Sequence, residues 1–424
     1  MSPPPVVYDL TRLALGPTLP VPRGIDRVDL GYADFLFRSW PGEAFGVLPL
    51  PLNLFGGALV LRRAAALRLV EYIAKVWGES GNADDDPAWQ FLQRRLADPD
   101  SLLAQPAPPH HFRPQRILAV LARLFRNGAC LRGALPQGTV YLNTGQLGLA
   151  FGWLTAWLGR RPDIKRIHML HDAIPLEFPE LVPPHGRDLH EAMVACTAAH
   201  ADGLIVTTQA VRRSVLAALA RHGGASMPVL AAPLPVPQPF MGSELAASKP
   251  CGRYFVILGS IEPRKNHALL LRVWERFAGE PDAPRLVIAG TPWRDTDGIA
   301  AAVRASPHLA RTVMLVSGLG SPALRHLLKG AQALLQPSLI EGFGLPIVEA
   351  LALGTPVIAS DQPAHREAGG VSATYLSAED VSAWESAIRA PHSRISGHAP
   401  WAWDGYGARV AAFVEAVAAQ PRRA

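Results

Sequence analysis

The chain has 424 residues, of which 49% are hydrophobic and 18% are charged, and its formal net charge at pH 7 is +6. Because this length exceeds one ordinary hydrophobic core, two domains of about 200 residues each are expected, and the composition excludes an intrinsically disordered chain. The positive charge favours anionic partners, which include nucleotide sugars, phospholipid headgroups and nucleic acid.

The cysteines and the start of the chain indicate the compartment. Cys130, Cys196 and Cys251 are widely spaced and form no CxxC pair, so they indicate neither a disulfide framework nor a zinc site. The first five residues lack the charged and apolar regions of a signal peptide, so a reducing cytoplasm is the expected location. The most apolar stretch, residues 146–158, is too short to cross a bilayer at roughly 20 residues per span, and a buried helix is predicted there.

The first half of the chain alternates strand-like and helix-like segments, which predicts a parallel sheet covered by helices. Strands are predicted at residues 6–10, 45–50, 58–61, 140–143, 167–170, 202–208 and 227–231, and helices at 24–40, 64–77, 185–200 and 209–221. A proline-rich loop is predicted between the first strand and the first helix. Residues 78–112 are rich in Gly, Asp, Pro and Gln and interrupt the alternation, so they are expected to form an insertion.

The segment 114–126 is predicted to be a strongly amphipathic helix, with aliphatic residues on one face and Arg116, Arg123 and Arg126 opposite. Such a helix can lie against anionic lipid headgroups, or it can pack on the core as an ordinary surface helix. The pattern leaves both alternatives open.

Candidate ligand contacts in the first half lie where a strand ends and where a helix begins. Strand 167–170 is followed by His171 and Asp172, and ligands of open α/β sheets gather at the carboxyl ends of strands. His171 is therefore the best functional candidate among the 14 histidines. Gly24 and Arg27 stand at the start of helix 24–40, where a guanidinium group and free amides can meet an anionic ligand.

The second half repeats the alternation after a proline-rich connector, and the domain boundary is placed near residue 245. Strands are predicted at 254–259, 286–289, 313–316, 333–335, 357–360 and 374–376, and helices at 322–329, 378–388 and 406–417. The turn after the first of these strands contains Arg264 and Lys265. Because Lys265 is one of only five lysines in an arginine-rich chain, its position indicates a need for a compact cation.

Residues 336–360 contain a strand end, a glycine loop, a helix and a new strand. Gly342 and Gly344 suit a turn that a ligand approaches closely. The free amides at the start of the following helix predict an anion site, and phosphate is the usual occupant. Glu341 and Glu349 flank this site, and from spacing alone each is either a ligand contact or an ordinary charged residue.

The string Pro-Ser-x-x-Glu-Gly-Phe-Gly-Leu-Pro-x-x-Glu-Ala at residues 337–350 resembles the signature of the retaining glycosyltransferases of family four, the glycosyl transferases group 1. That family has the α/β GT-B fold, in which two Rossmann-like, doubly wound domains face a cleft. Glu-Pro-Arg-Lys-Asn at residues 262–266 resembles its diphosphate-binding turn. The resemblance implies an acceptor-binding domain at 1–245, a nucleotide-sugar-binding domain at 246–400 and a C-terminal helix at 401–424 that returns to the first domain.

In the second domain, the resemblance implies contacts along the whole nucleotide sugar. Arg264 and Lys265 would neutralise the leaving nucleoside diphosphate, and Glu341 would lie beside the transferred sugar. Glu349 would hold the ribose, and Gly318 would lie by the nucleobase. The loop residues that would meet the sugar and the diphosphate are Gly342, Phe343, Gly344 and Leu345.

In the first domain, His171 and Asp172 resemble the family's site that faces the donor sugar. Gly24 and Arg27 match the family's glycine-rich turn, whereas Asp26 stands where a second glycine is common. Asp26 could touch the acceptor or merely complement the dipole of its helix.

The implied activity is transfer of a hexose from a nucleotide sugar to a glycan or a lipid-linked oligosaccharide in bacterial polysaccharide synthesis, such as exopolysaccharide or lipopolysaccharide. Mannose from GDP-mannose is the first choice, because His-Asp-x-x-Pro at 171–175 is similar to mannosyltransferase-like members, and UDP-glucose is the next. The family retains anomeric configuration. The expected enzyme is cytoplasmic, with peripheral contact to an anionic inner membrane and no nucleic-acid partner, since no nucleic-acid-binding module is recognisable.

Neither a metal nor a resident cofactor is expected. Asp84-Asp85-Asp86 and Asp295-Thr296-Asp297 resemble the metal-binding triplet of the other glycosyltransferase fold, but the first lies in a polar loop and is better explained as a solvated charge run. The second belongs to a surface turn. Two alternative functions stay open, namely a phosphorylase or epimerase of the same fold and a sugar-nucleotide-binding protein without catalysis.

Overall fold

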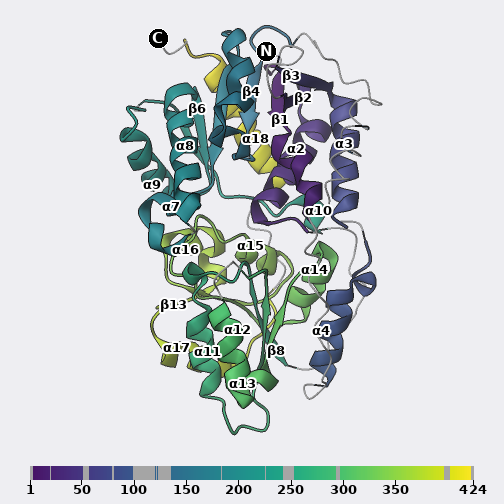
Figure 1. The fold of residues 1–424 in the computed structure, drawn as a ribbon, viewed down its shortest axis with the longest axis vertical. Helices are drawn as coiled ribbons and strands as arrows, with labels where there is room; N and C mark the ends of the chain where they lie inside the picture. Colours follow the sequence, from purple (N-terminus) through teal and green to yellow (C-terminus); the bar gives the residue numbers. More distant parts are fainter. Residues whose placement is uncertain are drawn as a thin grey trace.

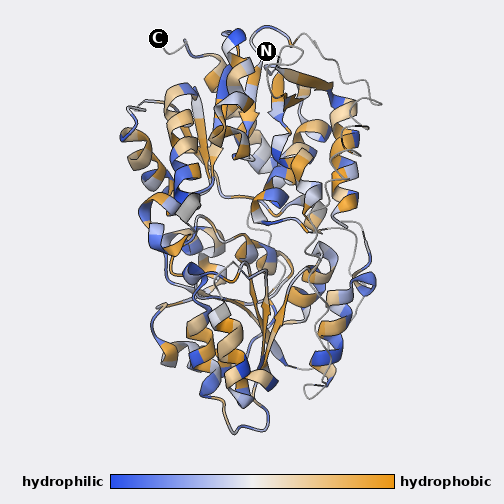
Figure 2. Ribbon diagram, viewed as in Figure 1, coloured by the Kyte–Doolittle hydropathy of each residue, from blue (hydrophilic) through white to orange (hydrophobic). Residues whose placement is uncertain are grey.

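The computed structural model describes residues 3–19, 21–50, 57–78, 81–98, 120, 122, 135–182, 184–224, 226–241, 253–292, 297–395 and 402–421. Two α/β domains lie one above the other in Figure 1, each built around its own sheet. The strands of both sheets are largely hydrophobic in Figure 2, which places a core on both faces of each sheet.

The first domain contains a seven-stranded sheet of order β3-β2-β1-β4-β5-β6-β7. Its strands are β1 Val6–Asp9, β2 Ala44–Pro49, β3 Ala58–Arg62, β4 Val140–Asn143, β5 Lys165–Leu170, β6 Gly203–Val206 and β7 Val229–Ala231. The main helices are α2 Gly24–Ser39, α3 Arg63–Val76, α8 Pro184–His200 and α9 Gln209–Ala220. All strand pairs are parallel except β2 with β3.

The antiparallel β3 differs from the purely parallel sheet that the alternation predicts. A parallel neighbour needs a crossover of roughly a dozen residues or more, and the connection between β2 and β3 is shorter than that. The edge of the first sheet is therefore a hairpin.

The second domain contains a six-stranded, wholly parallel sheet of order β10-β9-β8-β11-β12-β13. Its strands are β8 Tyr254–Leu258, β9 Arg285–Ala289, β10 Val313–Val316, β11 Leu334–Gln336, β12 Val357–Ser360 and β13 Thr374–Leu376. Its helices are α11 His267–Glu275, α12 Asp297–Ala305, α13 Pro307–Thr312, α14 Ser321–Gly330, α15 Leu345–Ala352, α16 Pro363–Gly369 and α17 Val381–Arg389. The strand order reverses direction beside β8 in this sheet and beside β1 in the first, so the prediction of two doubly wound domains is confirmed.

The prediction of one buried helix at residues 146–158 is wrong. The segment forms short turns, η4 Leu147–Ala150, α6 Gly152–Thr155 and η5 Ala156–Arg160, and Phe151 and Trp153 are 39% and 52% exposed. Glycines at 148 and 152 lower the helix propensity of the stretch, and Gln146 enters it with a φ of +62°.

The predicted proline-rich loop after β1 contains a short helix, α1 Thr11–Leu15, and a 3-10 turn, η1 Gly16–Thr18. The predicted insertion likewise contains secondary structure, η3 Ala83–Asp85 and α4 Pro87–Ala97. The predicted amphipathic helix at 114–126 lies outside the described residues except for Val120 and Ala122, and so does Asp295. In the described part of the chain, no helix is both long and apolar enough to span a bilayer.

The last helix, α18 Trp403–Ala418, packs on the first domain. Trp403 stacks on Phe35 and meets Tyr32 edge to face, and both partners lie on α2. At the other end of α18, a Cβ on Gly203 of β6 would lie 2.8 Å from Val417, so the close approach needs glycine. The chain therefore ends against the domain in which it began.

Candidate active site

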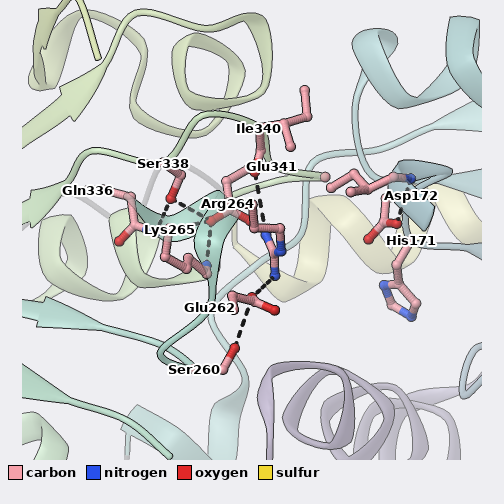
Figure 3. A network of polar contacts seen from close by, with 12 residues as sticks. His171, Asp172, Ser260, Glu262, Arg264, Lys265, Gln336, Ser338, Ile340 and Glu341 are labelled. Carbon is pink, nitrogen blue, oxygen red and sulfur yellow. Dashed lines mark hydrogen bonds and ion pairs between the residues drawn. The ribbon is translucent and has the colours of Figure 1, made fainter. Parts of the chain in front are cut away.

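The carboxylate of Glu341 lies at the centre of a buried ionic cluster in the second domain (Figure 3). Arg264 Nη1 lies 2.6 Å from Glu341 Oε2, and Lys265 Nζ donates to Oε1. Ser338 Oγ donates to Oε1 at 2.8 Å, and Gln336 Nε2 does so at 3.2 Å. Both carboxylate oxygens are therefore already engaged by cations and donors of the same domain.

A second carboxylate completes the cluster. Arg264 Nη2 lies 2.6 Å from Glu262 Oε1, which also accepts from Ser260 Oγ at 2.9 Å. Burial alone would raise the pKa of Glu341, but Arg264 and Lys265 outweigh it and hold that pKa well below its usual range. Burial lowers the pKa of Lys265, and the neighbouring Glu341 opposes this. The cluster contains two cations and two anions and is neutral as a whole.

Two loops that are far apart in the sequence form this cluster. The loop after β8 contains the 3-10 turn η7, Pro263–Lys265, and ends at Asn266, whose φ is +55°. Asn266 Nδ2 donates to the carbonyl of Pro337, and Leu339 N donates to the carbonyl of Arg264 at 2.7 Å. These bonds connect the loop after β8 to the loop after β11, which explains how Arg264 reaches Glu341.

The glycine loop between Glu341 and α15 lies against the first domain. A Cβ on Gly342 would lie 2.6 Å from the carbonyl oxygen of His171 and 2.9 Å from Asp172 Cβ. Thr207 Oγ1, after β6, donates to the Gly342 carbonyl at 2.8 Å. Gly344 has a φ of +101°, which only glycine adopts readily, and it precedes the first residue of α15. The neighbours Phe343 and Leu345 are buried.

Glu349 on α15 pairs with Arg27 across the two domains. The Arg27 Nη2 to Glu349 Oε1 distance is 3.1 Å, and the guanidinium lies 5.2 Å from the ring centroid of Phe240. Arg27 is 8% exposed, and its Nε and Nη1 find no hydrogen-bond partner among the residues that the structure describes. A Cβ on Gly24 would lie 4.0 Å from Leu345, so the starts of α2 and α15 face each other. This pair of helix starts with spare guanidinium donors is suited to an anion.

His171 is a buried, neutral imidazole of the first domain. Its Nε2 lies 2.8 Å from the carbonyl oxygen of Thr144, which can only accept, so Nε2 carries the proton and Nδ1 is an acceptor. Burial lowers the pKa of His171 to about 4, although the bond to Thr144 opposes this. Asp172 Oδ1 accepts from Ile174 N at 3.0 Å and thereby shapes the turn into α7, Ile174–Glu177. Figure 3 shows both side chains apart from the Glu341 cluster.

Gly318, which was predicted to lie by the nucleobase, follows β10, and β10 is two strands away from β8 in the second sheet. It has a φ of +83°. Asp26, discussed above as an acceptor contact or a helix-start carboxylate, accepts from its own helix start at Arg23 N and pairs with Arg12 at 2.6 Å. No group of three or more His, Cys, Asp or Glu side chains is arranged to hold a metal within the described ranges.

Sequence reasoning missed a buried polar group in the first domain. Asp29 Oδ1 accepts from Tyr8 Oη and from Thr144 Oγ1, the latter at 2.8 Å. Burial raises the pKa of Asp29 to about 7. Sequence reasoning also missed Gln362, whose Oε1 accepts from the backbone N of Glu341 at 3.0 Å. The one available signal was Asp29 itself, a carboxylate among the apolar residues of α2.

Comparisons with known proteins find glycosyltransferases among the relatives of this chain. Residues 252–392 match the family model of glycosyl transferases group 1. The chain is 31% identical over 226 residues to the serotype-specific mannosyltransferase WbdA of Escherichia coli, covering 50% of this chain and 28% of that protein. It is 46% identical over 66 residues to the O-antigen chain mannosyltransferase RfbU of Salmonella typhimurium, covering 16% of this chain and 19% of that protein.

The chain thus spans less than a third of the length of the curated relatives named here. Among solved structures, sucrose-phosphate synthase from Thermosynechococcus elongatus superposes with a TM-score of 0.53 at 16% identity, covering 91% of this chain and 89% of that one. At this identity, the match shows the fold alone. Residues 252–392 thus match the glycosyl transferases group 1, and the chain has the two-domain GT-B fold.

Proposed function

We propose that the chain is a retaining hexosyltransferase that moves mannose from a nucleotide sugar to a glycan or lipid-linked acceptor in bacterial polysaccharide synthesis. The observation that carries the proposal is the buried arrangement of Arg264, Lys265 and Glu341 beside the glycine loop and the start of α15. The names of the two mannosyltransferase relatives support mannose as the sugar and surface polysaccharide as the product. GDP-mannose is the preferred donor, and UDP-glucose is the alternative.

The leaving group explains the choice of cations. Breaking the anomeric C–O bond leaves its electron pair on the diphosphate, so negative charge develops there while positive charge develops on the sugar. Fixed cations and helix-start amides that are held before the reaction stabilise such charge without reorganising. Arg264, Lys265 and the amides at the start of α15 are arranged for this task, and no metal ion is needed in the proposal.

The sugar would lie between the two domains. The acceptor nitrogen Nδ1 of the neutral His171 can take a hydrogen bond from a donor-sugar hydroxyl, and Gly342 lies directly against the backbone of His171. Retention follows if the acceptor hydroxyl attacks from the face that the diphosphate leaves and gives its proton to a diphosphate oxygen. The first domain would bind the acceptor. The proposed location is the cytoplasmic face of the inner membrane, where lipid-linked acceptors are exposed.

A binding measurement tests the donor first. A ligand at one hundred times its Kd stabilises a protein by about 2.7 kcal/mol, so GDP, UDP, ADP and dTDP can be compared by thermal shift. We expect GDP to stabilise most, and Lys265→Met to weaken this effect. The matched control is Lys329→Met, because Lys329 is exposed at the far end of α14.

A transfer measurement tests the reaction. Radiolabelled GDP-mannose and UDP-glucose are incubated with the protein and with lipid-linked glycans extracted from a polysaccharide-forming bacterium, and the new linkage is determined by NMR. An α-linked product from an α-linked donor confirms retention. Stabilisation without transfer would favour a binding protein, and release of sugar phosphate upon addition of inorganic phosphate would favour a phosphorylase.

A further inference from the structure

Helix α4 belongs to the first half of the sequence but packs on the second domain. Figure 1 shows it beside α14; α4 contacts β10, and the turn η3 that precedes it contacts α14. Trp89 is fully buried, with its ring 5.9 Å from that of His326 on α14. Arg95 Nη2 donates to the carbonyl of Ala310 on α13 at 3.3 Å. We call residues 83–97 the strap, because they run from the first domain along the outside of the second.

A single carboxylate fixes the beginning of the strap to the second domain. Asp86 Oδ1 caps α4 by accepting from Ala88 N at 2.9 Å and from Trp89 N at 3.3 Å. Its other oxygen, Oδ2, accepts from Gly320 N at 2.8 Å, and Gly320 is the residue before α14. Asp86 therefore lies at the starts of two helices, and both helix dipoles favour a negative charge there. Its neighbour Asp85 is exposed.

The interpretation of residues 84–86 as a solvated charge run is therefore wrong for its last member. Asp84 and Asp85 are exposed, but Asp86 is partly buried and bonded to a loop 234 positions away in the chain. The physical reason is that a polar run can also cap the next helix, and Pro87 in the first turn is typical of such a start.

The loop that Asp86 holds continues the edge of the sheet that carries the active site. Gly290 N, after β9, donates to the carbonyl of Val316 at the end of β10 at 2.9 Å. A Cβ on Gly290 would lie 1.7 Å from the carbonyl oxygen of Gly259, and one on Gly259 would lie 3.2 Å from Lys265 Cε. The loops after β8, β9 and β10 thus form one strip from Lys265 to residue 320. Ligands of open α/β sheets lie along such a strip at the carboxyl ends of the strands.

We propose that Asp86 is a positioning residue for the donor nucleotide. With the diphosphate at Lys265, the nucleoside extends along the strip toward the loop 317–320, and Asp86 holds that loop in the conformation that meets it. Asp86 acts through Gly320 and does not itself touch the nucleotide. The inference rests on the proposed function, since it requires a nucleoside diphosphate as ligand, and it adds that donor affinity depends on a residue supplied by the first half of the chain.

The substitution Asp86→Ser separates this role from helix capping. Serine caps a helix start about as well as aspartate, so α4 keeps its cap, but the shorter side chain does not reach Gly320. Gly320 is partly exposed, so water can take the place of the lost acceptor. We expect the melting temperature to stay near that of the wild type, and we expect the Kd for GDP, measured by calorimetry, to rise by about fivefold or more. The KM for the sugar nucleotide should rise with it while kcat changes little.

The matched control is Asp85→Ser, which should leave the melting temperature, Kd and KM unchanged. If Asp86→Ser lowers the melting temperature, Asp86→Asn is measured as well, because asparagine keeps the volume and one acceptor oxygen and should give a smaller rise in Kd. An unchanged Kd in Asp86→Ser, with or without a lower melting temperature, would overturn the inference and leave the proposed function intact. If wild-type protein binds none of the four nucleoside diphosphates, the proposed function fails and the inference fails with it.

Discussion

The two sides of the candidate site, here called its first-domain and second-domain walls, differ in their electrostatics. The second-domain wall is ionic, with Arg264 and Lys265 paired to buried carboxylates. The first-domain wall carries less charge, because burial lowers the pKa of His171 to about 4, which keeps the imidazole neutral, and raises that of Asp29 to about 7. Both walls are buried to a similar degree, so burial alone does not set the charge state. Whether a buried group is charged depends on the presence of opposite charges within reach.

This difference matches the two halves of the proposed reaction. A diphosphate carries charge and needs cations that are already in place, whereas sugar hydroxyls need neutral donors and acceptors. Arg27 is the exception, since it projects from the first domain and pairs with Glu349 of the second. The predictions below change one wall at a time.

The largest effect is expected from Glu341→Gln on the ionic wall. Removing one partner of a buried ion pair leaves an uncompensated charge, which costs about 3 to 5 kcal/mol of the free energy of unfolding. Because Lys265 then lacks its carboxylate partner and Arg264 keeps only Glu262, nucleoside diphosphate should raise the melting temperature more than it does in the wild type. Urea denaturation with and without GDP measures both effects.

Two variants serve as comparisons for Glu341→Gln. Asp361→Asn removes the carboxylate of an exposed pair with Arg366, and it should leave the free energy of unfolding nearly unchanged because solvent screens such a pair. Glu349→Gln should instead weaken nucleotide binding, since the proposed ribose contact loses a charged acceptor. A loss of GDP binding in Glu341→Gln equal to that in Glu349→Gln would contradict the separate roles.

The next effect concerns the contact between the walls. In Gly342→Ala, the new Cβ would lie 2.6 Å from the carbonyl oxygen of His171, so the domains must separate. A displacement of this kind between reacting groups costs about 100-fold in rate. Steady-state kinetics of transfer measure it, and Gly405→Ala is the control because a Cβ there meets nothing within 4 Å. Activity within about tenfold of the wild type would show that the contact is not needed for transfer.

Residues that are neighbours in the sequence could be assigned to a candidate site from the sequence, and contacts between residues that meet only in three dimensions could not. In each of the segments 260–266 and 337–350, the cations, glycines and carboxylates are close together in the sequence. The chemistry of each segment can therefore be inferred from the sequence alone. The pairing of Glu341 with Lys265 spans 76 positions, and Asp29 meets Thr144 across 115. No local sequence pattern indicates either contact.

The fold, too, could be predicted where the sequence pattern is local and could not be predicted where distant segments meet. Strongly periodic helices and apolar strands were predicted close to their observed bounds, because propensity and burial agree there. The strap was predicted only as an insertion, since its partner lies on the other domain and composition carries no information about it. The prediction of a buried helix at 146–158 failed because the apolar residues were taken as evidence of a helix although glycines interrupt them.

The third effect is a difference in pH dependence between the domains. Burial lowers the pKa of His168 to about 3 and that of His171 to about 4 in the first domain, and of His267 and His365 to about 4 in the second. Each imidazole stays neutral when folded but takes a proton when unfolded below pH 6.5. The free energy of unfolding therefore falls between pH 6.5 and 4, by up to about 1.4 kcal/mol per pH unit for each.

In the first domain, Asp29 and Asp9 oppose this loss, because burial raises the pKa of both carboxyl groups. The folded pKa of Asp29 is raised to about 7, so the stability it contributes is present at low pH and is lost as the pH rises toward 7. The second domain should therefore lose stability more steeply on acidification, by about 1.4 kcal/mol per pH unit. Hydrogen exchange at pH 5 and 6.5, resolved by domain, measures the difference. Asp29→Asn should reduce it, and equal slopes in the wild-type protein would contradict the assignment.

The smallest effect on the rate of transfer is expected from chelation of divalent metal ions. If Arg264 and Lys265 supply the charge that the leaving diphosphate needs, then EDTA should leave kcat unchanged, whereas Lys265→Met should lower it. Added Mn²⁺ should not restore the Lys265→Met enzyme, because a divalent ion needs carboxylate ligands and both carboxylates of the cluster are committed to Arg264 and Lys265. Loss of wild-type activity in EDTA, reversed by Mn²⁺, would show that a metal neutralises the diphosphate. The ionic wall would then serve to position the glycine loop.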